Sequence, residues 1–231
     1  MSLQFIKSKR SLLNELCLFD AQKRFSILNK YYMTNQTKWS IDQAHSEIGF
    51  KARHLMIAHV KGTFKKFDAS IYTTGKNFST AEVDVWIDAS SITTGDEKRD
   101  EHLKSTDFFD VQNHKQITFT SSTMGKPDFA GITELWGELT MIGVTKNIKL
   151  NVEFGGIVVD PWGKEKAGLS ISGKIKRSDW GLVWNAALET GGIMVGDEIT
   201  ISCEIELVNE GQKDLTMELE TSTSHKKTVQ F

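Results

Sequence analysis

Apolar and polar residues alternate along most of the chain between Trp39 and Leu207. The clearest example runs from Val144 to Phe154, where the even positions are apolar apart from Lys146 and the odd positions are polar. Successive side chains of a β-strand point to opposite faces, so a period of two predicts a strand with one buried and one wet face. The same alternation predicts seven further strands, at residues 48–52, 67–71, 81–87, 117–119, 135–139, 169–175 and 199–207.

These eight predicted strands indicate an antiparallel all-β protein. Strands that are buried on both faces, as in a parallel sheet, read as continuous apolar runs, and the predicted strands alternate instead. An open sheet of this size would leave its apolar face in water, so the choice is between a closed barrel and a two-sheet sandwich. One helical insert is expected at Asp96–Lys104, with Thr94 as its N-cap and acidic residues in its first turn.

The length of the strands bears on what the interior holds. Eleven residues span roughly 36 Å at about 3.3 Å a residue, so a barrel of such strands is long and narrow. An eight-stranded barrel has room either for side chains alone or for one small ligand. Two interpretations of the apolar interior therefore stay open, a core filled with side chains and a cavity for an extended apolar molecule.

The two ends of the chain differ from its middle. All 18 glycines lie at or after Gly49, and residues 1–33 are basic with one weak helical pattern. We expect residues 1–37 to be an N-terminal extension, either disordered or preceding a native start at Met33, with a targeting segment as the alternative. Residues 38–209 form the predicted barrel domain. Residues 210–231 are polar and aperiodic, which predicts a flexible tail.

Composition and charge exclude several classes of protein. With 39% hydrophobic and 25% charged residues, the chain has the composition of a globular protein. Residues 34–210 carry 19 Lys and Arg against 25 Asp and Glu without a basic cluster, which argues against nucleic acid as a partner. No stretch approaches the ~18 apolar residues that a membrane-spanning helix needs. The N-terminal segment lacks a signal-peptide cleavage site, so we expect a cytoplasmic location, with a periplasmic one as the alternative.

The residue types that most often carry catalysis or bind metals form no recognisable constellation in the sequence. His54 and His59 are five positions apart, which points them to opposite sides of a strand or a helix. Cys17 and Cys203 follow no metal-ligand spacing. The sequence also lacks the nucleotide-binding, metalloprotease and serine-hydrolase motifs. We therefore expect no metal, no cofactor and no catalytic residue, and we predict that the protein is not an enzyme.

A series of short motifs occurs in order along residues 38–208. They are WSID (39–42), HSEIGF (45–50), HLM (54–56), VKGTF (60–64), SITT (91–94), RDEHLKS (99–105), DFF (107–109), GELT (137–140), GVTK (143–146), RSDWG (177–181) and VGDEI (195–199). No single motif is specific, but the ordered set resembles the YceI-like family of polyisoprenoid-binding, lipocalin-like proteins.

This resemblance implies an elongated eight-stranded antiparallel barrel, here with one or two short helical inserts, that often occurs as a homodimer. It also implies that the barrel binds, stores or transports a long-chain amphiphilic lipid, such as an isoprenoid or a fatty-acid derivative. The apolar positions expected to contact such a ligand are Phe50, Phe64, Phe67, Val85, Phe108, Phe119, Leu139, Ile148, Leu150, Ile171 and Ile201. The candidates for contact with its head group are His54, Arg99, Asp100 and His102.

Two alternatives to a lipid carrier remain at this point. The first is a hydrolase or isomerase that acts on a lipid at the barrel mouth through His54, Asp100 or His102. Two of these side chains within hydrogen-bond reach beside the cavity would favour it, whereas side chains tied to the backbone would favour plain binding. The second is a barrel with a filled core that acts through its outer surface.

Overall fold

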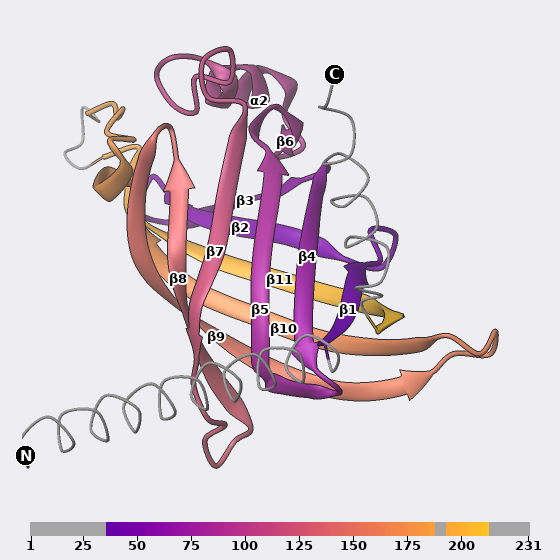
Figure 1. Cartoon of the computed structure of the whole chain (residues 1–231). Helices are drawn as coiled ribbons and strands as arrows, with labels where there is room; N and C mark the ends of the chain where they lie inside the picture. Colours follow the sequence, from indigo (N-terminus) through magenta and orange to yellow (C-terminus); the bar gives the residue numbers. More distant parts are fainter. Residues whose placement is uncertain (1–35, 188–192, 213–231) are drawn as a thin grey trace, which may run out of the picture. The chain divides into compact units, whose positions relative to one another are not determined.

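The computed structural model describes residues 36–187 and 193–212 of the chain (Figure 1). This part contains eleven strands, one α-helix and two 3-10 helices. The strands are β1 (Gln36–Ile41), β2 (Glu47–His54), β3 (Ala58–Phe64), β4 (Phe67–Thr74), β5 (Asn77–Asp88), β6 (Ile92–Thr93), β7 (Gln116–Met124), β8 (Ile132–Met141), β9 (Val144–Val159), β10 (Glu165–Lys176) and β11 (Val195–Gln212). The helices are η1 (Ala89–Ser91), α2 (Glu97–Lys104) and η2 (Arg177–Trp180).

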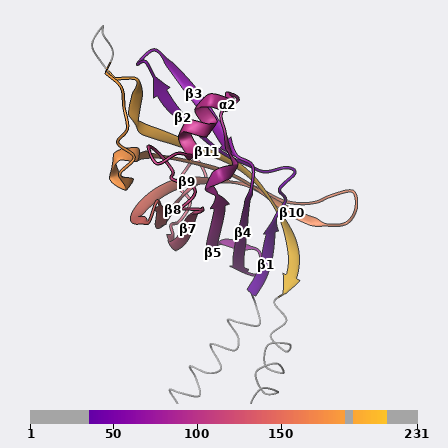
Figure 2. The ribbon, with the colours of Figure 1, turned by 90° about the horizontal axis from the view of Figure 1, so that it is seen from above.

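Eight of the strands close into an antiparallel barrel, in the order β1-β4-β5-β7-β8-β9-β10-β11, with β1 pairing again with β11. In the view from above, β5, β7 and β8 belong to one wall and β11 crosses the opposite one (Figure 2). The all-β, eight-stranded barrel expected from the sequence is therefore confirmed. Of the two architectures left open by the alternation alone, the structure shows the barrel and not the sandwich.

The membership of the barrel differs from the sequence prediction in one strand. The predicted strand at residues 48–52 is β2, which pairs with residues 195–204 of β11. β3 pairs with β2, and β6 pairs with β3, so these three strands extend the sheet beyond the barrel. The eighth barrel strand is β1, which the alternation did not predict because Trp39 and Ile41 are its only apolar residues. Trp39 is fully buried, and its indole N–H donates to the Thr73 hydroxyl of β4 over 2.9 Å.

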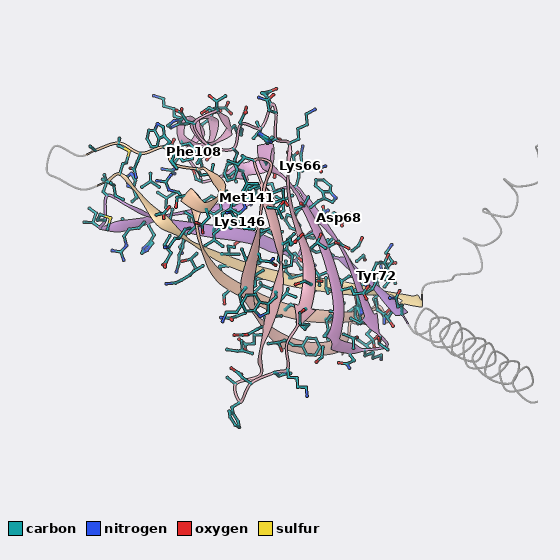
Figure 3. All side chains as sticks on the ribbon, turned by 60° about the vertical axis from the view of Figure 1, so that its left-hand side comes forward. Lys66, Asp68, Tyr72, Phe108, Met141 and Lys146 are labelled. Atoms are coloured by element: carbon teal, nitrogen blue, oxygen red, sulfur yellow. The ribbon has the colours of Figure 1, made fainter. Side chains whose placement is uncertain are left out.

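The inner faces of the strands carry the core and the outer faces carry the charge. Ile148, Leu150 and Val152 of β9 are buried, whereas the residues between them are exposed. The same alternation holds on β4, where Asp68 and Tyr72 lie on the outer side of the strand (Figure 3). On β9 and β4, the alternation in the sequence therefore predicts correctly which side chains face inward.

Helix α2 lies over one end of the barrel, beside β6 (Figures 1 and 2). The sequence predicted the helix, but its cap is different from the one expected. Asp96 is the N-cap, and its carboxylate accepts from the backbone N–H of Arg99 over 2.9 Å. Thr94 instead donates its backbone N–H and its hydroxyl to Asp100 of the helix, over 2.8 and 2.5 Å. An Asp immediately before the first turn also suits the positive end of the helix.

The described residues from Lys38 to Gly211 form a compact unit of their own. Most of the expected N-terminal extension, 1–37, and of the expected tail, 210–231, lies outside the described residues, so both stay predictions.

Candidate ligand cavity

An apolar cavity of about 250 Å³ lies inside the barrel and is lined by every one of its eight strands. Along β11 the lining runs from Val195 to Leu207, which corresponds to about 40 Å of strand at ~3.3 Å a residue. Among the residues that the structure describes, Arg177 is the one charged residue in the lining. The interior is therefore long, narrow and almost wholly apolar.

Ten of the eleven positions that the sequence assigned to a ligand line this cavity. They are Phe50, Phe64, Val85, Phe108, Phe119, Leu139, Ile148, Leu150, Ile171 and Ile201. Phe67 does not line it, although the residue is buried in the same core cluster. Phe108, which follows α2, and Met141, at the end of β8, both lie near the helix-covered end of the barrel (Figure 3).

Glycines on the inner face make room for the bulky residues of the lining. Register places Gly173, Ile201, Phe50 and Gly62 in one row across four neighbouring strands, and Leu150 of β9 lies against Gly173 at the end of this row. A Cβ atom at position 173 would lie 2.5 Å from Leu150 Cδ2, and one at position 62 would overlap the Phe50 ring. The large side chains therefore occupy the space above their small neighbours, which leaves the barrel axis open.

The end of the cavity under α2 is aromatic. Phe64 lies between Phe50 and Phe109, with ring centroids 5.8 and 6.0 Å apart. Outside this layer, the ring of His102 packs edge-on against Phe108 and Trp184, at 5.1 and 4.7 Å. Trp184 belongs to the segment that follows η2, so the helix and this segment meet over the barrel end.

Arg177 holds that segment in place and was not predicted from the sequence. Its guanidinium donates to the backbone carbonyls of Leu182, Trp184 (2.8 Å), Val195 (3.3 Å) and Gly196 (3.0 Å). The side chain is buried, and burial lowers the pKa of the guanidinium, which stays positively charged. The RSDWG motif contains this residue, but only the tertiary structure shows that it joins the segment after η2 to the start of β11 by hydrogen bonds.

The four head-group candidates lie outside the cavity lining. Arg99 donates to the hydroxyl and the carbonyl of Thr94, and Asp100 accepts from the same residue. Burial opposes ionisation of Asp100, but the hydrogen bonds from Thr94 outweigh it and lower the pKa of this carboxyl.

The two histidine candidates are bound elsewhere. His102 Nε2 lies 2.9 Å from Asp107 at a partly exposed position. His54 ends β2, where its carbonyl accepts from Ile57. Contact of these residues with a head group stays a prediction.

Three side chains of types that can bind metals lie close together on the outer surface, and the sequence analysis did not predict this group. Ligand atoms of Asp42, His45 and Glu206 all lie within 4.8 Å of one another. The Lys166 ammonium donates to Asp42 and Glu206 over 3.0 and 2.6 Å, so a protein cation already compensates both carboxylates. Hydrogen bonds from His45 and Lys166 lower the pKa of Asp42 to about 2, and the same ion pairs raise the pKa of Lys166.

Cys203 lies on the inner face of β11 and lines the cavity. The side chain is buried, and this burial raises the pKa of the thiol to about 11. A thiol rather than a thiolate therefore contributes to the wall at neutral pH, where it acts as a small apolar side chain.

A closed antiparallel barrel around a narrow apolar cavity places the protein among the lipocalin-like barrels. Residues 39–207 match the YceI-like domain, and the chain belongs to this family. It is 37% identical over 171 residues to a UPF0312 protein of Staphylococcus epidermidis, covering 74% of this chain and 96% of the relative.

Solved structures agree with this assignment. The crystal structure of the YceI protein of Campylobacter jejuni has 35% sequence identity and a TM-score of 0.57, covering 75% of this chain and 96% of that one. A polyisoprenoid binding domain from Saccharophagus degradans shares the fold at 15% identity with a TM-score of 0.54, covering 74% of this chain and 98% of that one. In the described ranges, α2 and the 3-10 helices are too short and too polar to cross a bilayer.

Proposed function

We propose that the protein binds one long-chain amphiphilic lipid, an isoprenoid or a fatty-acid derivative, in the barrel and stores or transports it. The observation that carries the proposal is the cavity, whose lining is apolar apart from Arg177 over the length of β11 from Val195 to Leu207. Apolar walls stabilise a hydrocarbon chain by removing its surface from water, at roughly 25 cal/mol per Å². A narrow, long interior suits a linear chain better than a globular ligand.

Family membership supports the same proposal, since the resemblance to the YceI-like family implies a barrel that binds a long-chain lipid. The polyisoprenoid binding domain of Saccharophagus degradans has the same fold, at an identity that supports the fold alone. A homodimer, which the resemblance to the family implies, is part of this proposal, and its test is the mass of the protein in solution by analytical ultracentrifugation.

A catalytic alternative receives less support from the geometry. Asp100 is held by Thr94, and His102 is paired with Asp107 on the partly exposed side of α2. Neither of these two side chains lines the cavity, and His54 does not line it either. A hydrolase or isomerase would need an acid and a base beside the bound chain. We therefore propose binding without chemical conversion of the ligand.

The proposal is tested by native mass spectrometry of protein purified without added lipid, together with uptake of a fluorescent long-chain fatty acid. The wild type is expected to carry a copurified lipid or to take up the probe with one-to-one stoichiometry. Ile201→Trp is expected to fill the cavity and abolish uptake. Thr200→Trp, on the outer face of the same strand, serves as the control and is expected to bind normally.

The same variants separate a lined cavity from a filled core. In a lined cavity, the extra volume of Ile201→Trp enters empty space and changes the melting temperature of the delipidated protein little. In a filled core, overpacking would cost about 1–3 kcal/mol. A wild type without bound lipid or uptake, combined with a strongly destabilised Ile201→Trp, would defeat the proposed function.

A further inference from the structure

The β2–β3 hairpin combines an apolar tip with basic strands. At the tip, Ile57 is 86% exposed and Met56 is 50% exposed. Leu55 and Met56 have φ angles of 50° and 61°, in the left-handed region that such side chains rarely adopt. Two successive residues in this region make the turn tight, and the side chains of Met56 and Ile57 extend from it into solvent.

Both strands of the hairpin carry unpaired cations on their outer face. Residues 51–61 include Lys51, Arg53 and Lys61 and contain no Asp or Glu. Lys51 lies directly across from Lys61, and Arg53 lies across from His59. Like charges in directly opposed positions destabilise an isolated antiparallel pair. In the described part of the chain, none of these three cations takes part in an ion pair, and Arg53 donates only to the Met56 carbonyl over 3.0 Å.

The hairpin tip touches the segment that borders the cavity. The backbone N–H of Leu55 donates to the Met194 carbonyl over 2.9 Å, and Val195 beside it lines the cavity. Two further apolar residues of this segment are exposed, Val183 at 69% and Ile193 at 41%. Figures 1 and 2 both show the β2–β3 turn beside the described chain that leaves η2 and the chain that enters β11. An apolar rim with cations behind it therefore adjoins this end of the barrel.

We propose that the β2–β3 hairpin docks the barrel onto an anionic lipid bilayer. Met56 and Ile57 enter the interfacial region, while Lys51, Arg53 and Lys61 attract the anionic head groups. An anionic surface offsets the repulsion between Lys51 and Lys61, and this would explain why two lysines lie directly across from each other. The inference rests on the proposed function, because docking beside the cavity lets a lipid pass between bilayer and barrel with little exposure to water.

The β9–β10 hairpin provides a matched control. Its tip also exposes apolar side chains, with Val158 and Val159 at 66% and Trp162 at 83%. It projects on the opposite side of the barrel from the β2–β3 turn (Figures 1 and 2). Residues 158–166 carry two acidic residues, Asp160 and Glu165, and two basic ones, Lys164 and Lys166, so this hairpin lacks the net positive charge of the other. If exposed apolar residues alone caused binding, the two hairpins would behave alike.

The test is co-sedimentation of the full chain with vesicles of phosphatidylcholine containing a minority of phosphatidylglycerol, beside vesicles of phosphatidylcholine alone. The wild type is expected to bind the anionic vesicles more tightly, and added salt is expected to weaken this binding. Lys51→Gln with Lys61→Gln is expected to weaken it by about tenfold or more, from the typical contribution of a cation near an anionic membrane. Met56→Ser with Ile57→Ser is expected to lower binding as well, whereas Val158→Ser with Val159→Ser leaves it unchanged.

Uptake of a fluorescent fatty acid delivered from cyclodextrin is measured on the same variants, since it needs no bilayer. Normal uptake by the β2–β3 variants, together with their weakened vesicle binding, supports docking and excludes misfolding. The docking inference is overturned if the wild type binds both kinds of vesicle equally, or if the β2–β3 variants bind as well as the wild type. It is also overturned if the wild type binds no vesicles, which is the result expected if the hairpin docks onto a protein instead. Vesicle binding by a wild type that takes up no probe overturns the proposed function and leaves docking in place.

Discussion

Leu150 of β9 lies over Gly173 of β10, so that the side chain of one residue occupies the space that the other leaves empty. A Cβ atom at position 173 would lie 2.5 Å from Leu150 Cδ2. Leu150 lines the cavity, and so does Ile201, which lies across from Gly173 on the next strand. The width of the cavity at this level therefore depends on a glycine.

Gly173→Ala is expected to narrow the cavity with little loss of stability. The atom that must move is the far end of a flexible leucine side chain that lines the cavity, so its displacement changes the shape of the cavity wall. We expect the affinity for a long-chain fluorescent lipid to fall, while the free energy of unfolding changes by within about 1 kcal/mol. Ser172→Ala, one residue away on the outer face, is the control. Equal lipid affinities of the two variants would contradict the role of Gly173.

Arg177→Lys is expected to loosen the chain beside the barrel end. A lysine cannot serve the four carbonyls that Arg177 reaches, and buried carbonyls without donors are costly. We expect a loss of roughly 1.5–3 kcal/mol in the free energy of unfolding, the range of hydrogen bonds to a charged group. Hydrogen exchange should quicken most in residues 181–187 and 193–196. The control is Arg53→Lys, which loses one exposed hydrogen bond. A similar loss of unfolding free energy in both variants would argue against the structural role of the Arg177 hydrogen bonds.

Cys203 is expected to react slowly with thiol reagents. Burial raises its pKa to about 11, so the reactive thiolate is scarce at neutral pH and the inner face limits access. The measurement uses Cys17→Ser protein, in which Cys203 is the remaining cysteine of the two in the chain. Labelling with a chromogenic disulfide should accelerate as the pH rises toward the pKa and slow further when a long-chain lipid is added. Labelling at the rate of the urea-unfolded protein would show that the thiol does not line a closed wall.

Asp42→Asn is expected to destabilise the barrel in a pH-dependent manner. The pKa of Asp42 in the folded protein is about 2, below its ordinary value of 3.8, so the ionised carboxylate stabilises the fold above that ordinary value. This contribution is lost as the pH falls from 3.8 to about 2. At neutral pH we expect a cost of about 1–2 kcal/mol, given the hydrogen bonds to charged partners.

The measurement for this variant is the difference in unfolding free energy from wild type, followed by urea denaturation from neutral to acidic pH. The difference should shrink toward the acid end. Glu153→Gln, at an exposed position of β9, is the control and should show a small difference throughout. A cost of Asp42→Asn that grew on acidification would contradict the ion-pair account.

Much of the cavity wall was predictable from the sequence because its signal is local. Alternation assigns each side chain to a face without any knowledge of pairing, so Leu150, Ile171 and Ile201 could be placed inside before the barrel was known. Helix α2 was likewise predictable from its charge pattern. Its cap was not, because Thr94 and Asp96 both precede the helix, and the structure shows that Thr94 donates to Asp100 while Asp96 accepts from the first turn.

Only the tertiary structure decided which strands close the barrel and which side chains meet at its end. β1 takes the place expected for β2 because strand pairing depends on residues distant in sequence, such as Trp39 and Thr73. Arg177 reaches the carbonyls of Val195 and Gly196 across a long separation in sequence, and no local period signals such a contact. Alternation determines the face on which a side chain lies, whereas the partner it meets is set by the closure of the sheet.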